Sequence, residues 1–314
     1  MNVLVAMVLA ASFPAPPEAG IDEAVAAARA GFAADDLGAT VVAARALADQ
    51  HSRMRARIDS QEPTPEVERA DAAVEATLRL LATSMANRSS TTRRAAARVA
   101  ERAAATELYA LYLERFPSSA QANELRFFSA EMLFALARFP EAAREYARVA
   151  QVDQAGRWRE AAAEEAVRAW DSQRALERTA HPRGAGERAF TEAEREELAA
   201  CARYRVAVPE GRMTEWCAWL EARIALDAGF TAVGIARLKD YLRAWPRAVG
   251  APRAVELVLE DLDTRSDEGA QRAFIAELRT NRLLMDNAAV RDVLDPPLGP
   301  DVEVTMTVGT PIAP

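Results

Sequence analysis

The sequence predicts an all-α protein, a right-handed α–α superhelix built from stacked helical hairpins. The first observation is a repeated helix ending: residues 112–117 and 241–246 both read Tyr-Leu, two variable residues, an aromatic residue and Pro. A small residue, Ala105 or Gly234, precedes each proline at the same distance. The second observation is composition, because half of the 314 residues are hydrophobic and only 6% are aromatic. Helical segments that repeat one pattern are typical of arrays in which hairpins stack along one axis.

The first predicted hairpin covers residues 21–49. Its first helix has an apolar face that includes Ala28 and Phe32, and a turn is expected at residues 35–38. The return helix carries Leu47 on its apolar face and continues to about residue 58.

Prolines and capping residues set the next boundaries. Thr64 followed by Pro65 predicts an N-cap with proline in the first helical position. This helix is expected to run to about residue 85, and the polar residues 87–92 are interpreted as a linker. The long helix that follows is predicted to stop at Pro117.

The clearest hairpin comes after this stop. Ser118 and Gln121 predict a capping box for its first helix. We expect that helix to include residues 127–137, with a turn at 138–140 and a second helix at 141–149. An ordinary helical bundle with chance alanines is the alternative, because the chain is rich in alanine throughout.

The second half continues the pattern after one interruption. A helix from residue 158 to about 178 precedes a break at 179–186, and Thr191 with Glu194 predicts a capping box that restarts the helix. The remaining predicted pairs are residues 213–228 with 231–245 across Gly229, and residues 255–262 with 269–284. The whole array is therefore assigned to residues 21–294.

The two ends of the chain differ from the array. Residues 1–12 are apolar, too short to span a bilayer, and interpreted as a signal peptide, although no Lys or Arg precedes the apolar run. The alternative is a frayed helix of a cytoplasmic protein. Residues 295–314 are interpreted as an extended or disordered tail, because apolar and polar residues alternate from Val302 to Val308.

The repeated segments resemble tetratricopeptide-repeat (TPR) proteins. Residues 116–149 resemble the TPR segments of bacterial envelope proteins of the Tol-Pal and outer-membrane-assembly types. Residues 200–209, 257–262 and 274–278 are similar to TPR proteins associated with gliding motility in delta-type bacteria, although Leu226 and Asp227 stand in a helix that is usually rich in tyrosine. The resemblance implies a protein-interaction scaffold, periplasmic or associated with the outer membrane, and it implies no catalytic residues.

The residues themselves favour binding over chemistry. The only two histidines, His51 and His181, lie far apart, and no metal-ligand motif, phosphate-binding glycine loop or nucleophile elbow is present. The net charge of −8 disfavours nucleic acid as the main partner. We therefore expect no cofactor, no metal and no integral membrane span, with a protein or peptide as partner. The alternatives are a cytoplasmic adaptor or regulator and, less favoured, an enzyme with a site on the 179–190 loop.

The resemblance also places a partner-binding face. In TPR arrays the first helix of each hairpin lines the concave side, and the i, i+3 and i+4 spacing puts the following residues in two stripes: Trp216, Trp219, Arg223 and Asp227, and, one clear hairpin earlier, Glu124, Phe127, Glu131 and Phe134. Exposed aromatic residues beside an arginine are typical of binding hot spots. The alternative for Trp219 and Phe127 is packing in the core, so Trp216 is the sharper candidate.

Cys201 and Cys217 are expected to lie close together. They are equidistant from Pro209, the centre of a predicted turn, so two antiparallel helices would place them at the same height. A disulfide requires both side chains to face the partner helix. The alternative is two buried thiols that act as small apolar side chains.

Overall fold

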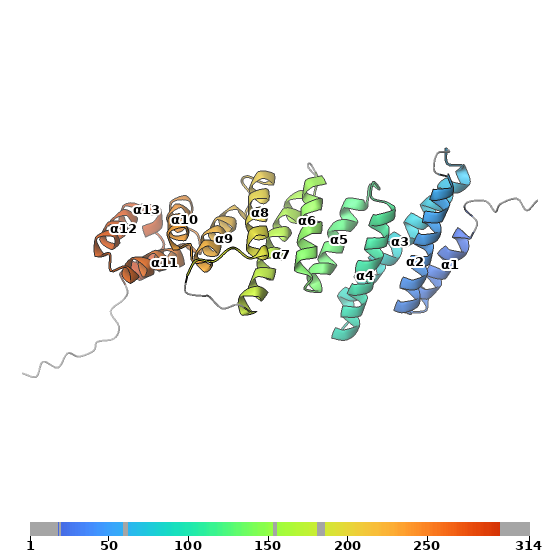
Figure 1. Cartoon of the computed structure of the whole chain (residues 1–314), viewed down its shortest axis with the longest axis horizontal. Coiled ribbons are helices and arrows are strands. Elements are labelled where there is room, and N and C mark those ends of the chain that lie inside the picture. The colour runs from blue at the N-terminus through green and yellow to red at the C-terminus, as the bar shows by residue number, and fades with distance from the viewer. Residues whose placement is uncertain (1–17, 19, 59–61, 153–155, 181–185, 296–314) are drawn as a thin grey trace, which may run out of the picture. The chain divides into compact units, whose positions relative to one another are not determined.

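The described residues form an all-helical chain, which confirms the predicted fold class. A computed structural model describes residues 18, 20–58, 62–152, 156–180 and 186–295 (Figure 1). Within these ranges there are fourteen helices and no strand. The predicted signal peptide, the predicted tail beyond residue 295, and His181 lie outside the described residues.

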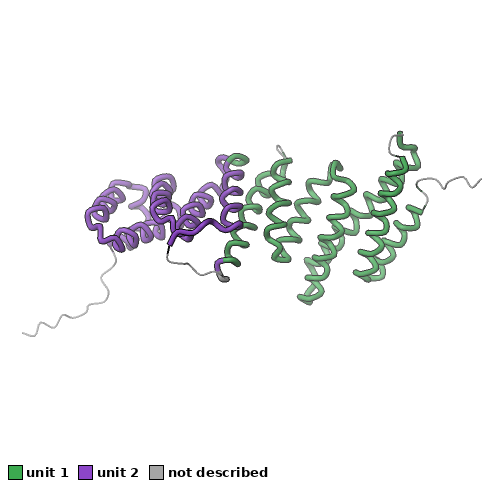
Figure 2. Tube along the Cα trace, viewed as in Figure 1, with its two compact units in different colours: residues 1–177, 206–208 green, residues 178–205, 209–314 purple. Residues whose placement is uncertain are grey.

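The chain divides into two compact units, shown in different colours in Figure 2. Unit 1 comprises residues 1–177 and 206–208, and unit 2 comprises residues 178–205 and 209–314. The helices of unit 1 are α1 (Ile21–Ala33), α2 (Leu37–Ile58), α3 (Pro65–Thr91), α4 (Ala95–Arg115), α5 (Ala122–Ala135), α6 (Phe139–Val152) and most of α7 (Arg159–Ala180). The helices of unit 2 are most of α8 (Glu192–Ala207), α9 (Thr214–Asp227), α10 (Thr231–Ala244), α11 (Ala251–Thr264), α12 (Glu268–Thr280), α13 (Arg282–Met285) and α14 (Ala288–Leu294).

Consecutive helices pack as hairpins in both units. The pairs are α1 with α2, α3 with α4, α5 with α6, α9 with α10, and α11 with α12. Second helices also pack on the first helix of the following hairpin, as α4 does on α5 and α10 on α11. Each unit encloses its own hydrophobic cluster, which runs from Ile21 to Leu125 in unit 1 and from Ala222 to Val290 in unit 2.

Four hairpins turn through the same backbone motif. Asp35, Ala137, Gly229 and Ser266 have φ values of 58°, 58°, 85° and 55°, in the left-handed region. Each donates its N–H to the carbonyl three residues earlier, and the next residue donates to the carbonyl five residues earlier. This pair of bonds is the Schellman motif, which satisfies the last carbonyls of the first helix. The turns predicted after α1, α5 and α9 are therefore confirmed.

The two predicted helix endings share one conformation. The N–H groups of Phe116 and Trp245 each donate to the carbonyl of the preceding tyrosine, Tyr112 or Tyr241, at 2.8 Å. The aromatic pairs are also alike, with ring centroids 5.6 Å apart at Tyr112–Phe116 and 5.7 Å at Tyr241–Trp245. Gly234, the small residue twelve positions before Pro246, allows α10 to pack closely on α9. A Cβ at this position would lie 2.6 Å from the Leu226 side chain.

Two predicted caps are confirmed. The Thr64 hydroxyl accepts a bond from the backbone of Val67 at 3.4 Å at the start of α3. Thr191 and Glu194 bond reciprocally at 3.2 and 2.9 Å before α8, as a capping box requires.

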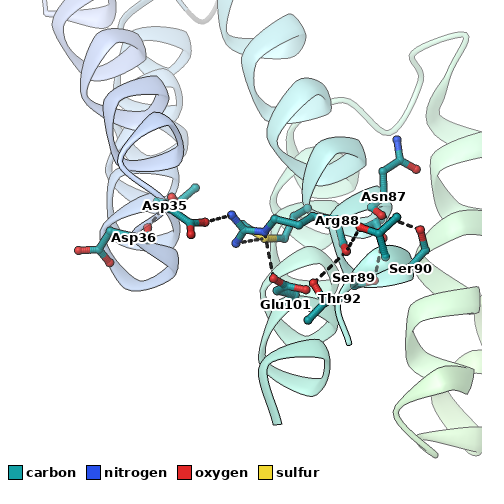
Figure 3. Close-up of polar contacts among 12 residues, drawn as sticks. Asp35, Asp36, Asn87, Arg88, Ser89, Ser90, Thr92 and Glu101 are labelled. Atoms are coloured by element: carbon teal, nitrogen blue, oxygen red, sulfur yellow. Dashed lines mark hydrogen bonds and ion pairs between the residues drawn. The ribbon is translucent and has the colours of Figure 1, made fainter. Parts of the chain in front are cut away.

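Two boundary predictions in unit 1 are wrong. Residues 87–92 are not a linker, because α3 continues to Thr91. Ser89 and Ser90 donate their hydroxyl protons to carbonyls of the same helix at 2.7 and 2.6 Å, so their polarity is accommodated inside the helix (Figure 3). The capping box of Ser118 and Gln121 does not form, because no side chain caps α5 and the N–H of Gln121 instead bonds to Ser119 at 3.3 Å.

The last predicted helix, residues 269–284, is interrupted. Helix α12 ends at Thr280, and the side chain of Asn281 accepts a bond from Leu284 at 3.2 Å, so it caps the short α13. An asparagine at this position favours the cap over helix continuation because its side chain competes for backbone bonds.

Candidate protein-interaction surface

Helix α9 carries the predicted stripe, which runs from an exposed indole to a buried carboxylate. Trp216 is 41% exposed. Trp219 is half-buried, and its ring centroid lies 5.6 Å from that of Tyr241 on α10. The Arg223 guanidinium lies 5.9 Å from the Trp219 ring and 3.7 Å from a carboxylate oxygen of Asp227. The exposed member of the stripe is therefore Trp216, while Trp219 contributes to packing.

A cleft of about 290 Å³ opens beside the C-terminal end of the stripe. Its wall consists of Arg223, Leu226 and Asp227 from α9, Thr231 and Ile235 from α10, and Leu257, Glu260, Asp261 and Thr264 from α11. Helices α9 and α11 are the first helices of adjacent hairpins, and α10 lies between them in the chain. The cleft thus includes two of the four predicted α9 residues, Arg223 and Asp227. It also includes a face of α11 that was not predicted from the sequence.

Acidic side chains dominate the charge in this cleft. Three carboxylates line it with a single guanidinium: Asp227, Glu260, Asp261 and Arg223. Glu260 pairs with Arg253 at 2.9 Å, and Asp261 pairs with Arg265, the residue that follows α11. The Asp227 and Asp261 side chains are only 3% and 10% exposed, whereas Glu260 is 59% exposed. The cleft therefore combines two sheltered carboxylates with one that reaches solvent.

The aromatic residues of the predicted α5 stripe pack inside unit 1. Phe127 is 8% exposed, and its ring stacks on that of Trp158 with centroids 4.5 Å apart. Phe134 packs edge-to-face on Phe139 of the same hairpin at 5.0 Å. The structure therefore places Phe127 in the core, whereas Phe134 is half-buried.

The acidic residues of that stripe are also engaged within unit 1. Glu124 pairs with Arg157, whose guanidinium lies 4.5 Å from the Trp158 ring. Glu131 accepts the hydroxyl proton of Tyr146 from α6. The i, i+3, i+4 spacing identified a helical face correctly but could not show what covers it.

The Tyr146–Glu131 pair belongs to a recurring tyrosine–glutamate contact that the sequence reading missed. Tyr112 of α4 donates to Glu75 of α3 at 2.8 Å, and Tyr241 of α10 donates to Glu215 of α9 at 2.9 Å. Burial raises the pKa of Tyr112 to about 12; a bond to Ser119 lowers it, and Glu75 adds to the rise. Each bond ties the second helix of a hairpin to the first, so these carboxylates have a structural use.

The two cysteines lie side by side in unit 2. Both are free thiols, fully buried, and hydrogen-bonded to each other. This contact to Cys217 and the burial of the side chain raise the pKa of the Cys201 thiol far above its usual range. The proximity predicted from the spacing therefore holds, and the disulfide stays a prediction.

The described part of the 179–190 loop is held by structural contacts. Arg188 donates two bonds to Glu194 at 2.7 and 2.6 Å. Its backbone N–H donates to the carbonyl of Ala228 at 2.9 Å, just beyond α9. Arg188 therefore fastens this segment to the ends of α8 and α9.

No metal centre is visible in the portion of the chain that the structure describes. That portion contains no group of three or more His, Cys, Asp or Glu side chains arranged to hold an ion. The His51 ring is tilted against the Phe116 ring, with centroids 5.1 Å apart, and its Nε2 is 2.8 Å from Asp71. Among the same residues, no helix is long and apolar enough to cross a bilayer.

Comparison with known proteins adds no relative to this picture. A scan against models of protein families gives no match, and a search of curated proteins finds no similar sequence. The fold and site therefore define the chain only as an all-α protein of repeated helical hairpins with a charged cleft on α9, α10 and α11.

Proposed function

We propose that the chain is a non-catalytic, TPR-like scaffold that binds a protein or peptide partner. The observation that carries this proposal is the cleft between α9 and α11, with the exposed ring of Trp216 on the same stripe of α9. Adjacent first helices separated by a shared second helix are the arrangement in which repeat arrays present a binding surface. Aromatic and arginine side chains concentrate binding energy at such surfaces.

The repeated local structure supports the TPR-like assignment. Gly229 and Ser266, which occupy equivalent turns, are separated by roughly one TPR period of about 34 residues. The matching helix ends at Phe116 and Trp245 lead in both cases into the first helix of the next hairpin. A right-handed superhelix and placement in the bacterial cell envelope complete the proposal. Mass spectrometry of the mature N-terminus separates the exported form from a cytoplasmic adaptor.

Partner binding is tested by selecting short random peptides displayed on phage against the full chain. Trp216→Ala is expected to weaken binding of the selected peptides by more than about 1 kcal/mol, because the contact area of the exposed indole is lost. Fluorescence anisotropy measures the affinity, and thermal unfolding checks that the fold is intact.

Val233→Ala serves as the matched control for this test. Val233 is 49% exposed on α10 and does not line the cleft, so its truncation should leave the affinity unchanged. Equal loss of affinity in both variants, or loss of folding in Trp216→Ala, would contradict the assignment of Trp216 to a binding surface.

A further inference from the structure

The charged cleft on α9, α10 and α11 also indicates the chemistry of the partner. We infer that it accepts a basic side chain, arginine or lysine, from a partner segment that carries an apolar residue next to it. The inference rests on the proposed scaffold function and specifies what the scaffold recognises.

The cleft is large enough to hold one long side chain. Its volume of about 290 Å³ lies just below the range of small-ligand pockets, roughly 300–1,000 Å³. Leu226, Ile235 and Leu257 supply apolar wall from three different helices. The stems of arginine and lysine are apolar and pack on such surfaces while their charged ends reach polar groups.

The charges of the wall favour a cation over an anion. Its only guanidinium, Arg223, already lies 3.7 Å from Asp227 and against the Trp219 ring. This leaves the carboxylates of Glu260 and Asp261 on the opposite wall, on α11. An anionic side chain would have to approach these two carboxylates, whereas a guanidinium or ammonium group would be attracted to them.

The present partner of Glu260 can be exchanged. Arg253 and Arg265 do not line the cleft, and their side chains are 47% and 51% exposed. The Glu260 side chain is itself 59% exposed, so its pair with Arg253 contributes roughly 0–1 kcal/mol. The Asp261 side chain is only 10% exposed and keeps Arg265 as its partner. A cation inserted from the cleft side can therefore replace Arg253 on Glu260 at small cost and join the Asp261–Arg265 pair.

Two further features favour the same partner. Trp216 and Arg223 lie on one face of α9, so an apolar neighbour of the inserted residue can reach the exposed indole. The net charge of −8 attracts a basic segment over a longer range and speeds its association.

The test uses peptides selected from an unbiased random library against the full chain. The enriched sequences are expected to contain arginine or lysine beside an apolar residue. Their affinity should fall several-fold between about 0.05 M and about 0.3 M NaCl, because salt screens the exposed carboxylate. The double variant Glu260→Gln/Asp261→Asn should bind the peptides at least about fivefold more weakly. If Asp261→Asn disturbs the fold, Glu260→Gln alone serves as the test and should give a smaller loss of affinity.

Asp240→Asn/Asp263→Asn is the control, because it removes the same charge from exposed positions outside the cleft. It should leave the affinity within about twofold of the original protein. Enriched peptides that are acidic or uncharged would overturn the inference, as would equal losses in the two double variants. Self-association that is lost in Glu260→Gln/Asp261→Asn would place a second copy in the cleft and also overturn it.

The outcomes separate this inference from the scaffold function. If the selected peptides require Trp216 but show no preference for basic residues, the scaffold function stands and only the inference of a basic partner is overturned. A selection that enriches no peptide overturns both.

Discussion

At the scale of single residues, buried tyrosines combine hydrophobic packing with one charged hydrogen bond. The rings of Tyr112 and Tyr241 are almost fully buried, yet each hydroxyl reaches a glutamate of the neighbouring helix. A phenol in such a place resists ionisation, because its anion would be desolvated and would face a carboxylate.

The Tyr112 environment predicts a loss of stability at alkaline pH. Its pKa is about 12 in the folded chain and near 10.0 when exposed, so above pH 10 the unfolded state loses its proton first. The free energy of unfolding should therefore fall as pH rises from about 10 to about 12, by roughly 2 kcal/mol from this residue. Urea unfolding at several pH values measures the slope, and Tyr112→Phe should show a shallower one. An identical slope in this variant would contradict the assignment.

The cysteine pair predicts unreactive thiols in the folded chain. Cys201 and Cys217 are fully buried, and the raised pKa of the Cys201 thiol disfavours the nucleophilic thiolate. Iodoacetamide at neutral pH should label neither residue in the native reduced protein and both after denaturation, as read by mass spectrometry. If the chain is exported, the same measurement without reductant should find a disulfide instead, because the two thiols are already in contact.

At the scale of helices and turns, the end of α3 is held by one arginine. The Arg88 side chain pairs with Asp35 beyond α1, and its Nε lies 3.1 Å from Glu101 of α4 (Figure 3). Glu101 is 7% exposed, so its carboxylate depends on this cation. A segment whose composition suggested a linker is therefore a junction of three helices.

Removing this arginine should destabilise unit 1. Arg88→Ala leaves the buried Glu101 carboxylate without its cation, so we expect a loss of about 2 kcal/mol or more in urea unfolding. Arg55→Ala is the comparison, because Arg55 pairs with Asp71 at 3.2 Å but is 49% exposed. Its loss should stay below about 1 kcal/mol, and equal effects would show that burial of the pair does not matter.

The shared hairpin turn predicts opposite effects of glycine and alanine at equivalent positions. The left-handed backbone conformation of Ala137 is strained for a residue with a Cβ, so Ala137→Gly should stabilise the chain by about 0.5–1 kcal/mol. Gly229→Ala should destabilise it by more than about 1 kcal/mol, because the new Cβ would be strained at φ 85° and would lie 2.4 Å from the carbonyl of Gly186. Shifts of the denaturation midpoint in the same direction would contradict a common turn.

At the scale of the whole molecule, the described residues include a separate hydrophobic cluster in each unit. One runs through α1–α5 in unit 1, and the other runs through α9–α14 in unit 2. Within each unit, most contacts join helices that are neighbours or next neighbours in the chain, and α11 also packs on α14. In such molecules stability is approximately a sum of hairpin terms and neighbour terms. The predicted superhelix concerns the arrangement of all hairpins together, and it stays a prediction.

This locality explains how much of the fold the sequence alone determined. Helix ends at Pro117 and Pro246, the cap at Thr64 and the capping box at Thr191 depend on residues within one turn, so their chemistry can be read along the chain. The same is true of the left-handed turn at Gly229. The prediction of a linker at residues 87–92 was wrong because serine and threonine hydroxyls can bond to carbonyls inside a helix as well as outside one.

Only the tertiary structure decided which helical faces are open. Phe127 and Trp216 came from stripes with the same spacing, yet Phe127 is covered by Trp158 while Trp216 remains exposed. The cleft likewise required α11 to place Glu260 and Asp261 opposite α9. The physical reason is that periodicity specifies which side chains share a face of one helix, whereas burial depends on what a neighbouring helix places against that face.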